Sequence, residues 1–516
     1  MEQPTLPKFT ALSDATDDMN TLARGASTAL VGKTVGRFLQ MLVQIVIGRL
    51  LGPALFGLYS IGLAVLQTVG IFLQLGLDNG VIRYGTSFWQ KDPRKVNSIV
   101  IRSVTYALIS GLVIGIGFYL LAPFLAVTFF KKPDLEPVFR LFAFSFPFAS
   151  ALGVAAAATT ISRRMKYSVI AETLIVPVAN FALVVAANLL HTGLTGSIVA
   201  TVLSFVVGFG FALRYLTILF PGIFKNVEFL EPTLREILRF SLPTALASMI
   251  YMLILRVDRL FAGYFLTAAD VGNYQAMTQF SLPITLVMTS FNTIFAPMIA
   301  SLHQSGRKTD LEELYRISTK WGLYIVLPFA LVILAAPGEI VPLIFGDKYA
   351  ATALPLVILM IAALVNVSTG SVGRILVMSG YQNDWLWLTA GAFVVDIILC
   401  IIFIPMMGIA GAALGPSVAV IALMLGGLWR VRQAVGIWPY DRRYWKGAIA
   451  TLVTLAVLLV LRLFVLQTPW LFFTLAIILA FGVFAGTLFL IGLDKEDKTF
   501  LQTILKRLRK YSGNAA

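Results

Sequence analysis

Positively charged and amide side chains recur inside an otherwise apolar stretch near the N-terminal end of the sequence. Lys33, Arg37, Gln40 and Gln44 follow one another at spacings of four, three and four residues, which places them on one face of an α-helix. A cation near the centre of a bilayer costs about 2.5–3.5 kcal/mol, so this face needs water, an acidic partner or an anionic ligand. The pattern predicts either ion pairs within the protein or a site for an anionic group, since arginine and lysine both hold phosphate.

More ionisable residues lie within or at the ends of later apolar segments. Arg256 and Arg259 flank Asp258, which is a candidate to neutralise one of them, and Arg374 follows a polar stretch, where it could also be an interfacial anchor. The predicted cationic binding set is Lys33, Arg37, Arg256, Arg259 and Arg374. Supporting polar residues, which also suit hydrogen bonding between helices, are Gln40, Gln44, Asn79 and Gln275. Candidates for pairing with the cations, or for proton or sodium coupling, are Asp78, Glu172 and Asp396.

The composition determines which elements must position these residues. Of 516 residues, 58% are hydrophobic and 13% charged, and the mean hydropathy is +0.87, which excludes the soluble globular classes. Long continuous apolar runs, rather than alternating ones, exclude a β-barrel. At about 20 apolar residues per crossing, the chain has room for about 14 spans. One cysteine and two histidines leave no basis for a disulfide framework or a metal site, so neither a metal nor another cofactor is expected. The sequence predicts an all-α polytopic membrane protein.

The basic residues predict how these spans are oriented. Lysine and arginine concentrate in the even-numbered connections and in the C-terminal tail, which places both termini in the cytoplasm. The net charge of +15 is then a topology signal and an attraction to anionic lipid, not a sign of nucleic-acid binding. The first 25 residues lack the apolar core of a cleavable signal peptide.

An internal repeat divides the chain. Gly48, Leu51, Gly57 and Tyr59 recur 215 residues later as the same residue types, and a glycine pair near residue 195 recurs at the same offset. Six spans per copy predict two lobes related by a pseudo-two-fold axis along the membrane normal, with a cleft between them. The expected parts are an N-terminal cytoplasmic tail (1–25), an N-lobe (26–222), a C-lobe (223–432), two C-terminal spans (433–493) and a basic amphipathic tail (494–516).

Three sequence stretches resemble one transporter family. They are GRLLGPALFGLYS (48–60), LGLDNGVIRYG (75–85) and RVDRLFAGYFLTAADVGNYQAM (256–277). They are similar to the lipid-linked oligosaccharide flippases of the multidrug/oligosaccharidyl-lipid/polysaccharide (MOP) exporter superfamily. That resemblance implies alternating access without ATP hydrolysis, in the inner membrane of a bacterium. The implied cargo is an undecaprenyl-pyrophosphate-linked oligosaccharide, as in O-antigen synthesis, with a polysaccharide polymerase and glycosyltransferases as candidate partners.

Competing functions predict different features. A cation-coupled drug exporter of the same superfamily needs intramembrane carboxylates, whereas Lys33 and Arg37 have the opposite sign. A peptidoglycan-precursor exporter fits the two additional C-terminal spans, although no motif identifies it. A membrane glycosyltransferase or polymerase needs catalytic acids on a sizeable loop, and the connections here are short. The expected function is therefore transport of a lipid-linked oligosaccharide from the inner to the outer leaflet, with no enzymatic step.

Overall fold

The computed structural model describes residues 12–74, 76–89, 91–162, 166–223, 236, 252–253, 256–349, 353–465, 468–492 and 494, with the side chains of 12–31, 71–74, 293–294 and 297 left out. Throughout these ranges every regular element is a helix. Ten of the helices, or eleven if one bent pair counts as a span, are long and apolar enough to cross a membrane. The expected all-α, multi-pass architecture is confirmed. The expected span near 240–265 and the tail beyond 494 lie mostly outside the described residues.

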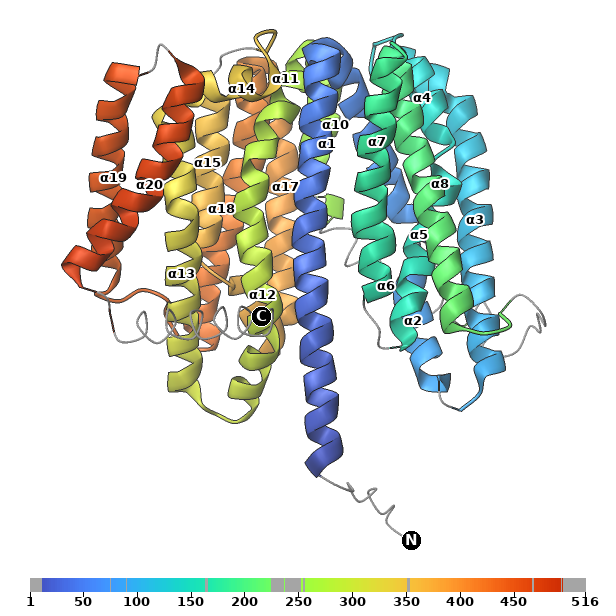
Figure 1. Cartoon of the computed structure of the whole chain (residues 1–516), viewed down its shortest axis with the longest axis horizontal. Helices are drawn as coiled ribbons and strands as arrows, with labels where there is room; N and C mark the ends of the chain where they lie inside the picture. The colour runs from blue at the N-terminus through green and yellow to red at the C-terminus, as the bar shows by residue number, and fades with distance from the viewer. Residues whose placement is uncertain are drawn as a thin grey trace, which may run out of the picture. The chain divides into compact units, whose positions relative to one another are not determined.

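The chain divides into two compact units, and α1 (Leu12–Gln74) contributes to both. Unit 1 comprises residues 1–43 and 65–249, and unit 2 comprises 44–64 and 250–516. The outer half of the first hairpin therefore packs with the second unit. Besides α1, the helices of unit 1 are α2 (Leu77–Phe88), α3 (Pro93–Pro123), η1 (Phe124–Phe129), α4 (Leu135–Ala143), α5 (Phe146–Thr159), η2 (Thr160–Ser162), α6 (Lys166–Ser168), η3 (Val169–Ile175), α7 (Val176–Leu189) and α8 (Gly193–Leu219) (Figure 1).

Unit 2 holds the remaining helices, and the last two form a hairpin beside α13 (Figure 1). They are α10 (Val257–Phe265), α11 (Ala268–Thr278), η4 (Gln279–Ser281), α12 (Leu282–Gln304), α13 (Lys308–Ala335), α14 (Pro337–Phe345), α15 (Ala353–Ser368), α16 (Val372–Met378), α17 (Gln382–Met407), α18 (Ile409–Ala434), α19 (Tyr444–Val465) and α20 (Pro469–Ile491).

The two copies of the repeat make the same sharp turn with different residues. In the first copy, Gly52 takes a left-handed φ of 73° inside α1 and Pro53 follows it, a pairing that breaks one helix and starts the next. At the equivalent place in the second copy, the side chain of Thr267 caps α11 and Asp270 completes a capping box. Each turn connects two consecutive helices at the end that the charge pattern assigns to the outside of the membrane.

The turns bring equivalent glycines into reciprocal contact within unit 2. A Cβ atom added to Gly57 would lie 1.7 Å from the Ala268 carbonyl oxygen, and one added to Gly272 would lie 1.9 Å from the Pro53 carbonyl oxygen. Gly57 and Gly272 are related by the repeat offset, and so are Pro53 and Ala268. Each glycine thus makes room for the backbone of the other copy. The contact has the two-fold symmetry that the sequence repeat predicts.

Polar contacts attach the C-terminal hairpin to α13 and α14 at its outer end and to α13 at its inner end. At the outer end, Arg462 donates hydrogen bonds to the Ala335 carbonyl oxygen at 2.8 Å and to Glu339 Oε1 at 3.2 Å. At the inner end, Asp494 accepts from Lys446 at 2.6 Å and lies 3.4 Å from Lys320, whose side chain is 2% exposed. A buried lysine needs such a partner, so Asp494 ties the end of α20 to both α13 and α19.

This inner attachment predicts a pH dependence of stability. Burial opposes ionisation of Asp494, but hydrogen bonds and attraction from Lys446 and Lys320 outweigh it and lower the pKa of this carboxyl below its ordinary value of 3.8. A lowered folded-state pKa stabilises the protein above the ordinary value, and the contribution is lost as the pH falls through the lowered one. Asp494→Asn should cost about 1–3 kcal/mol at neutral pH and lower the unfolding temperature in detergent.

The control for this measurement is Asp347→Asn, since Asp347 is exposed and has no partner among the described residues. At neutral pH it should unfold at the temperature of the unsubstituted protein. Acidification below the ordinary carboxyl pKa should narrow the difference between the unsubstituted protein and Asp494→Asn. A difference that stays constant down to acid pH would contradict the role assigned to the ionised carboxylate.

Candidate functional site

The inner half of α1 packs against η3 through glycines, and this packing determines which face its cations occupy. A Cβ atom on Gly32 would lie 2.3 Å from Val169 Cγ1, and one on Gly36 would lie 2.0 Å from the Thr173 carbonyl oxygen. Glycine at every fourth residue therefore lets the two helices approach closely. The cations follow each glycine directly in sequence and lie about 100° away around the helix. The packed face and the charged face are thus distinct.

Lys33, Arg37 and Gln40 are exposed on this second face of α1. Within the part of the chain that the structure describes, no carboxylate lies within 4.0 Å of Lys33 or Arg37. Glu172 on η3 interacts electrostatically with both Lys33 and Asp78 at longer range. Direct ion pairing, the alternative explanation for these cations, is therefore absent among the described residues. The sequence-predicted groups Lys33, Asp78 and Glu172 come together in unit 1.

In unit 2, Asp258 is buried and accepts a hydrogen bond of 2.6 Å from the Tyr274 hydroxyl. No ion pair between Asp258 and either flanking arginine is among the described contacts, and neutralisation of one of them by Asp258 stays a prediction. Among the described atoms, its second oxygen, Oδ1, has no partner, and neither does Nε of Arg259. The side chain that donates to this carboxylate is a tyrosine, not an arginine.

A second buried carboxylate lies near the first. Asp396 on α17 is 0% exposed and accepts from the Cys400 thiol at 3.4 Å, while its Oδ2 has no partner among the described atoms. Asp258 acts electrostatically on both Asp396 and Cys400. Gly415 on α18 closes the cluster, since a Cβ there would lie 2.8 Å from the Cys400 sulfur. Two incompletely satisfied carboxylates in one apolar region favour sharing of a cation or a proton. We call Asp258, Tyr274, Asp396 and Cys400 the acidic cluster.

Arg256 and Arg259 lie at the N-terminus of α10 and interact electrostatically with each other. Like charges repel, and the positive end of the helix dipole adds to this unfavourable potential. An anion placed here would gain from both arginines and from the helix terminus. The two side chains are partly exposed, so this position is accessible to such an anion.

The other predicted residues have no described contacts that indicate a function. Gln44 and Gln275 are 7% exposed and each leaves its side-chain oxygen without a partner among the described atoms. Asn79 is exposed on α2, and Arg374 is exposed on α16 with no carboxylate of a described residue within 4.0 Å. Lys33, Arg37, Gln40, Asp78, Asn79 and Glu172 belong to unit 1, and the rest of the predicted set belongs to unit 2.

Sequence reasoning missed two members of the acidic cluster. Cys400 lies one helical turn after Asp396, a spacing that puts both on one face. Tyr274 belongs to the repeat motif and corresponds to Tyr59, but its hydroxyl partner cannot be inferred from that match. The repeat offset also carries Asp258 onto Val43 and Asp396 onto Phe181, so this cluster exists only in the second copy.

The family model described as "Polysaccharide biosynthesis protein" matches residues 46–354. This match covers more than half of the chain. The chain belongs to the polysaccharide biosynthesis protein family. No protein with a curated function matches it in sequence.

Solved structures show the fold of this family member. A structure titled "Lipid II flippase MurJ, inward closed conformation" matches with a TM-score of 0.69 and 13% identity, over 87% of this chain and 97% of that one. An inward-facing multidrug resistance MATE transporter of the MOP superfamily matches with a TM-score of 0.63 and 18% identity, over 80% and 99%. A MOP superfamily transporter from Pyrococcus furiosus matches with a TM-score of 0.53 and 17% identity, over 80% and 97%. The expected resemblance to the MOP superfamily is confirmed at the level of the fold.

Proposed function

We propose that this protein is a flippase that moves an undecaprenyl-pyrophosphate-linked oligosaccharide from the inner to the outer leaflet of a bacterial inner membrane. The observation that carries the proposal is the pair of exposed cations Lys33 and Arg37 on an apolar span, without a carboxylate within 4.0 Å among the described residues. A pyrophosphate supplies the negative charge that these side chains lack. Membership in a polysaccharide biosynthesis family agrees with such a cargo.

The cations occupy different depths, measured along their helices from the outer hairpin turns. Arg259 precedes the turn at Thr267 by eight residues, whereas Arg37 precedes the turn at Gly52 by fifteen and Lys33 by nineteen. At 1.5 Å per helical residue these depths are about 12, 22 and 28 Å. Lys33 and Arg37 in unit 1 and Arg256 and Arg259 in unit 2 are therefore two separate candidate positions for an anionic group, each at its own distance from the outer turn of its helix.

The membrane potential favours this direction of transport. Moving one negative charge outward through 100 mV gains about 2.3 kcal/mol. The pyrophosphate and any acidic sugars would therefore be drawn outward without ATP. A polymerase and glycosyltransferases would then act on either side of this step.

A competing transport function would require side chains of different charge in unit 1. Export of a cationic drug requires carboxylates facing the substrate, and the accessible face of α1 offers Lys33 and Arg37 instead. The Pyrococcus furiosus structure is titled as having a binding pocket of reverse polarity that suggests a different function, so pocket charge varies within this fold. The MurJ structure shares the fold, and a pyrophosphate-linked peptidoglycan precursor would use the same cations. The glycan, not the anionic linker, distinguishes that alternative.

Reconstitution into proteoliposomes tests the proposal. The assay measures movement of a polyprenyl-pyrophosphate oligosaccharide to the opposite leaflet, with a polyprenyl alcohol carrying the same sugars but no phosphate as the control cargo. Arg37→Glu should reduce movement of the pyrophosphate cargo at least tenfold, about 1.4 kcal/mol or more. Arg214→Glu makes the same charge change at an exposed position on α8 in the same unit and should keep full activity. Equal activity of the two variants would refute the cationic site.

We further propose that the acidic cluster couples transport to a proton. Asp258 and Asp396 are buried and interact electrostatically, and each leaves one oxygen without a partner among the described atoms. Two carboxylates in an apolar region cannot both carry a charge cheaply, so they favour holding one proton between them. Asp78 and Glu172 in unit 1 are the alternative coupling acids.

A further inference from the structure

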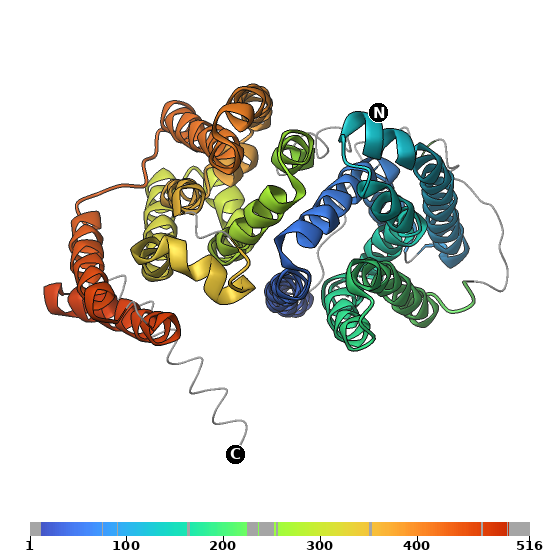
Figure 2. The same ribbon diagram turned by 90° about the horizontal axis from the view of Figure 1, so that it is seen from above.

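A groove lies on the outer surface of the hairpin that α17 and α18 form, and Figure 2 shows these two orange helices side by side. Its volume is about 460 Å³, which falls within the range of ligand pockets. The wall contains small residues, and a Cβ atom added to Gly391 would meet no atom within 4 Å. The groove is lined along its length mainly by Leu388, Gly391, Ala392, Val395, Ala422 and Leu423. An extended apolar chain could lie against this surface.

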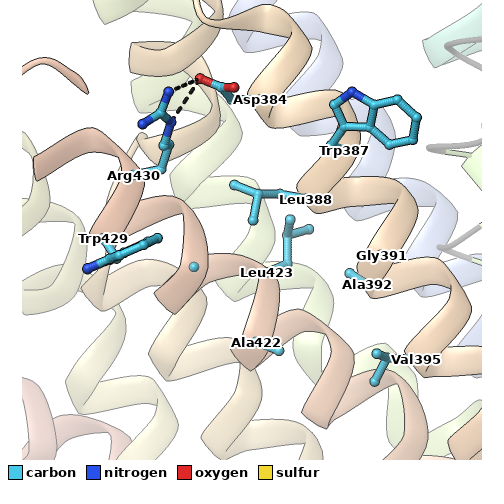
Figure 3. A pocket seen from close by; sticks show the side chains of 11 residues that line it. Asp384, Trp387, Leu388, Gly391, Ala392, Val395, Ala422, Leu423, Trp429 and Arg430 are labelled. Atoms are coloured by element: carbon cyan, nitrogen blue, oxygen red, sulfur yellow. Dashed lines mark hydrogen bonds and ion pairs between the residues drawn. The ribbon is translucent and has the colours of Figure 1, made fainter. Parts of the chain in front are cut away.

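Two tryptophans flank the groove near one end (Figure 3). Trp387 is 76% exposed and Trp429 is 63% exposed, although both are large and apolar. Tryptophan gathers where the apolar membrane meets the lipid head groups. Trp387 lies near the start of α17 and Trp429 lies near the end of α18, both far from the turn at Gly408 that joins these helices. The charge pattern assigns these two helix ends to the cytoplasmic side. The groove therefore begins at the head-group level of the cytoplasmic leaflet and continues inward past Gly391 to Val395.

An ion pair lies at the end of the groove that the tryptophans flank, which we call its mouth. The pair leaves one donor atom and one acceptor atom available to a ligand. Nε and Nη2 of Arg430 lie 2.9 and 2.8 Å from Oδ2 of Asp384 (Figure 3). Within the described residues, Nη1 of Arg430 and Oδ1 of Asp384 have no partner, and about one third of each side chain is exposed. The guanidinium also lies 5.8 Å from the ring centre of Tyr381, which restricts its position. A ligand at the mouth would meet a donor and an acceptor side by side.

We propose that this groove binds one phospholipid with a zwitterionic head group that carries a primary ammonium, of the phosphatidylethanolamine type. The lipid phosphate accepts a hydrogen bond from Arg430, its ammonium donates to Asp384, and one acyl chain lies along Gly391 between the two tryptophans. An anionic head group that lacks an ammonium would bring a second negative charge next to Asp384 and would offer no donor to its Oδ1 atom. A choline head group carries no N–H to donate. The site is independent of the cationic residues of α1 and of the proposed cargo.

Lipid retention by the full-length protein tests this site. The protein is purified in nanodiscs of equal parts phosphatidylethanolamine, phosphatidylglycerol and phosphatidylcholine, released into detergent, and its bound lipid is counted by native mass spectrometry. The unsubstituted protein should retain one phosphatidylethanolamine in preference to the other two lipids. Gly391→Leu fills the groove and should lower this retention about tenfold, equivalent to 1.4 kcal/mol.

Two further variants make the outcome specific. Gly482→Leu on α20 places the same side chain where a Cβ atom also meets nothing within 4 Å, and it should retain lipid as the unsubstituted protein does. Asp384→Asn should remove the preference for phosphatidylethanolamine over phosphatidylcholine while an acyl chain still occupies the groove. Equal retention of all three lipids by the unsubstituted protein, preference for phosphatidylglycerol, or unchanged retention in a folded Gly391→Leu protein would each overturn the proposal. None of these measurements depends on transport.

Discussion

Replacing Gly272 with leucine is expected to stop transport by disrupting the reciprocal contact between the two repeat copies. A Cβ atom at this position would overlap the Pro53 carbonyl oxygen at 1.9 Å, and backbone cannot move aside as a side-chain tip can. Overpacking of this kind costs about 1–3 kcal/mol, which shifts a two-state equilibrium by about 5–150-fold. Alternating access requires both states to be populated. Proteoliposome transport of the pyrophosphate cargo should therefore fall at least about fivefold, the lower end of that range.

The symmetry of this contact supplies an internal check. Gly57→Leu meets the Ala268 carbonyl oxygen and should reproduce the defect of Gly272→Leu. Gly117→Leu on α3, where a Cβ atom meets nothing within 4 Å, should transport normally. Size-exclusion profiles of the three variants should match that of the unsubstituted protein, which checks that they are folded. If a folded Gly272→Leu protein transports at the unsubstituted rate, the contact does not break during the cycle.

Asp396→Asn should uncouple transport from the proton gradient. The neutral amide cannot take up or release a proton, so stimulation of transport by an imposed pH gradient should be lost. Transport driven by the membrane potential alone should remain. Asp258→Asn should act in the same way, because Asp258 and Asp396 interact electrostatically. Proteoliposomes with a pH gradient, a sodium gradient or a potential imposed separately measure each contribution.

Controls for this uncoupling distinguish the acidic cluster from other carboxylates. Asp134→Asn changes an exposed carboxylate outside the cluster and should leave the response to the pH gradient intact. If Glu172→Gln removes that response while Asp396→Asn keeps it, the coupling acid lies in unit 1 instead. If a sodium gradient alone stimulates the unsubstituted protein, the proton assignment is wrong.

The sequence was sufficient to predict the helices and the repeat because both depend on local or periodic features. Apolar run length defined most spans, and the offset between Gly57 and Gly272 pointed to equivalent positions that are indeed in contact. The turn at Gly52 could also be expected, since glycine followed by proline interrupts a helix.

Contacts between side chains distant in sequence could not be predicted in the same way. The hydrogen bond from Tyr274 to Asp258 depends on how α11 returns beside α10, and the Asp494 attachment depends on where α20 ends relative to α13. Arithmetic on charges suggested an arginine partner for Asp258 because it lies between two arginines. The fold instead directs this carboxylate into the interior, where a tyrosine hydroxyl donates to one of its two oxygens.

Cys400 is the only cysteine in the sequence, and its side chain is fully buried beside Asp396. Thiol-reactive spin labels and fluorophores will therefore leave the native protein unmodified under mild conditions. Reporter cysteines can be introduced in pairs at exposed helix ends without first removing this residue and disturbing its carboxylate neighbour. The distances between such labels, followed with and without cargo, would reveal how far the two units travel during a turnover.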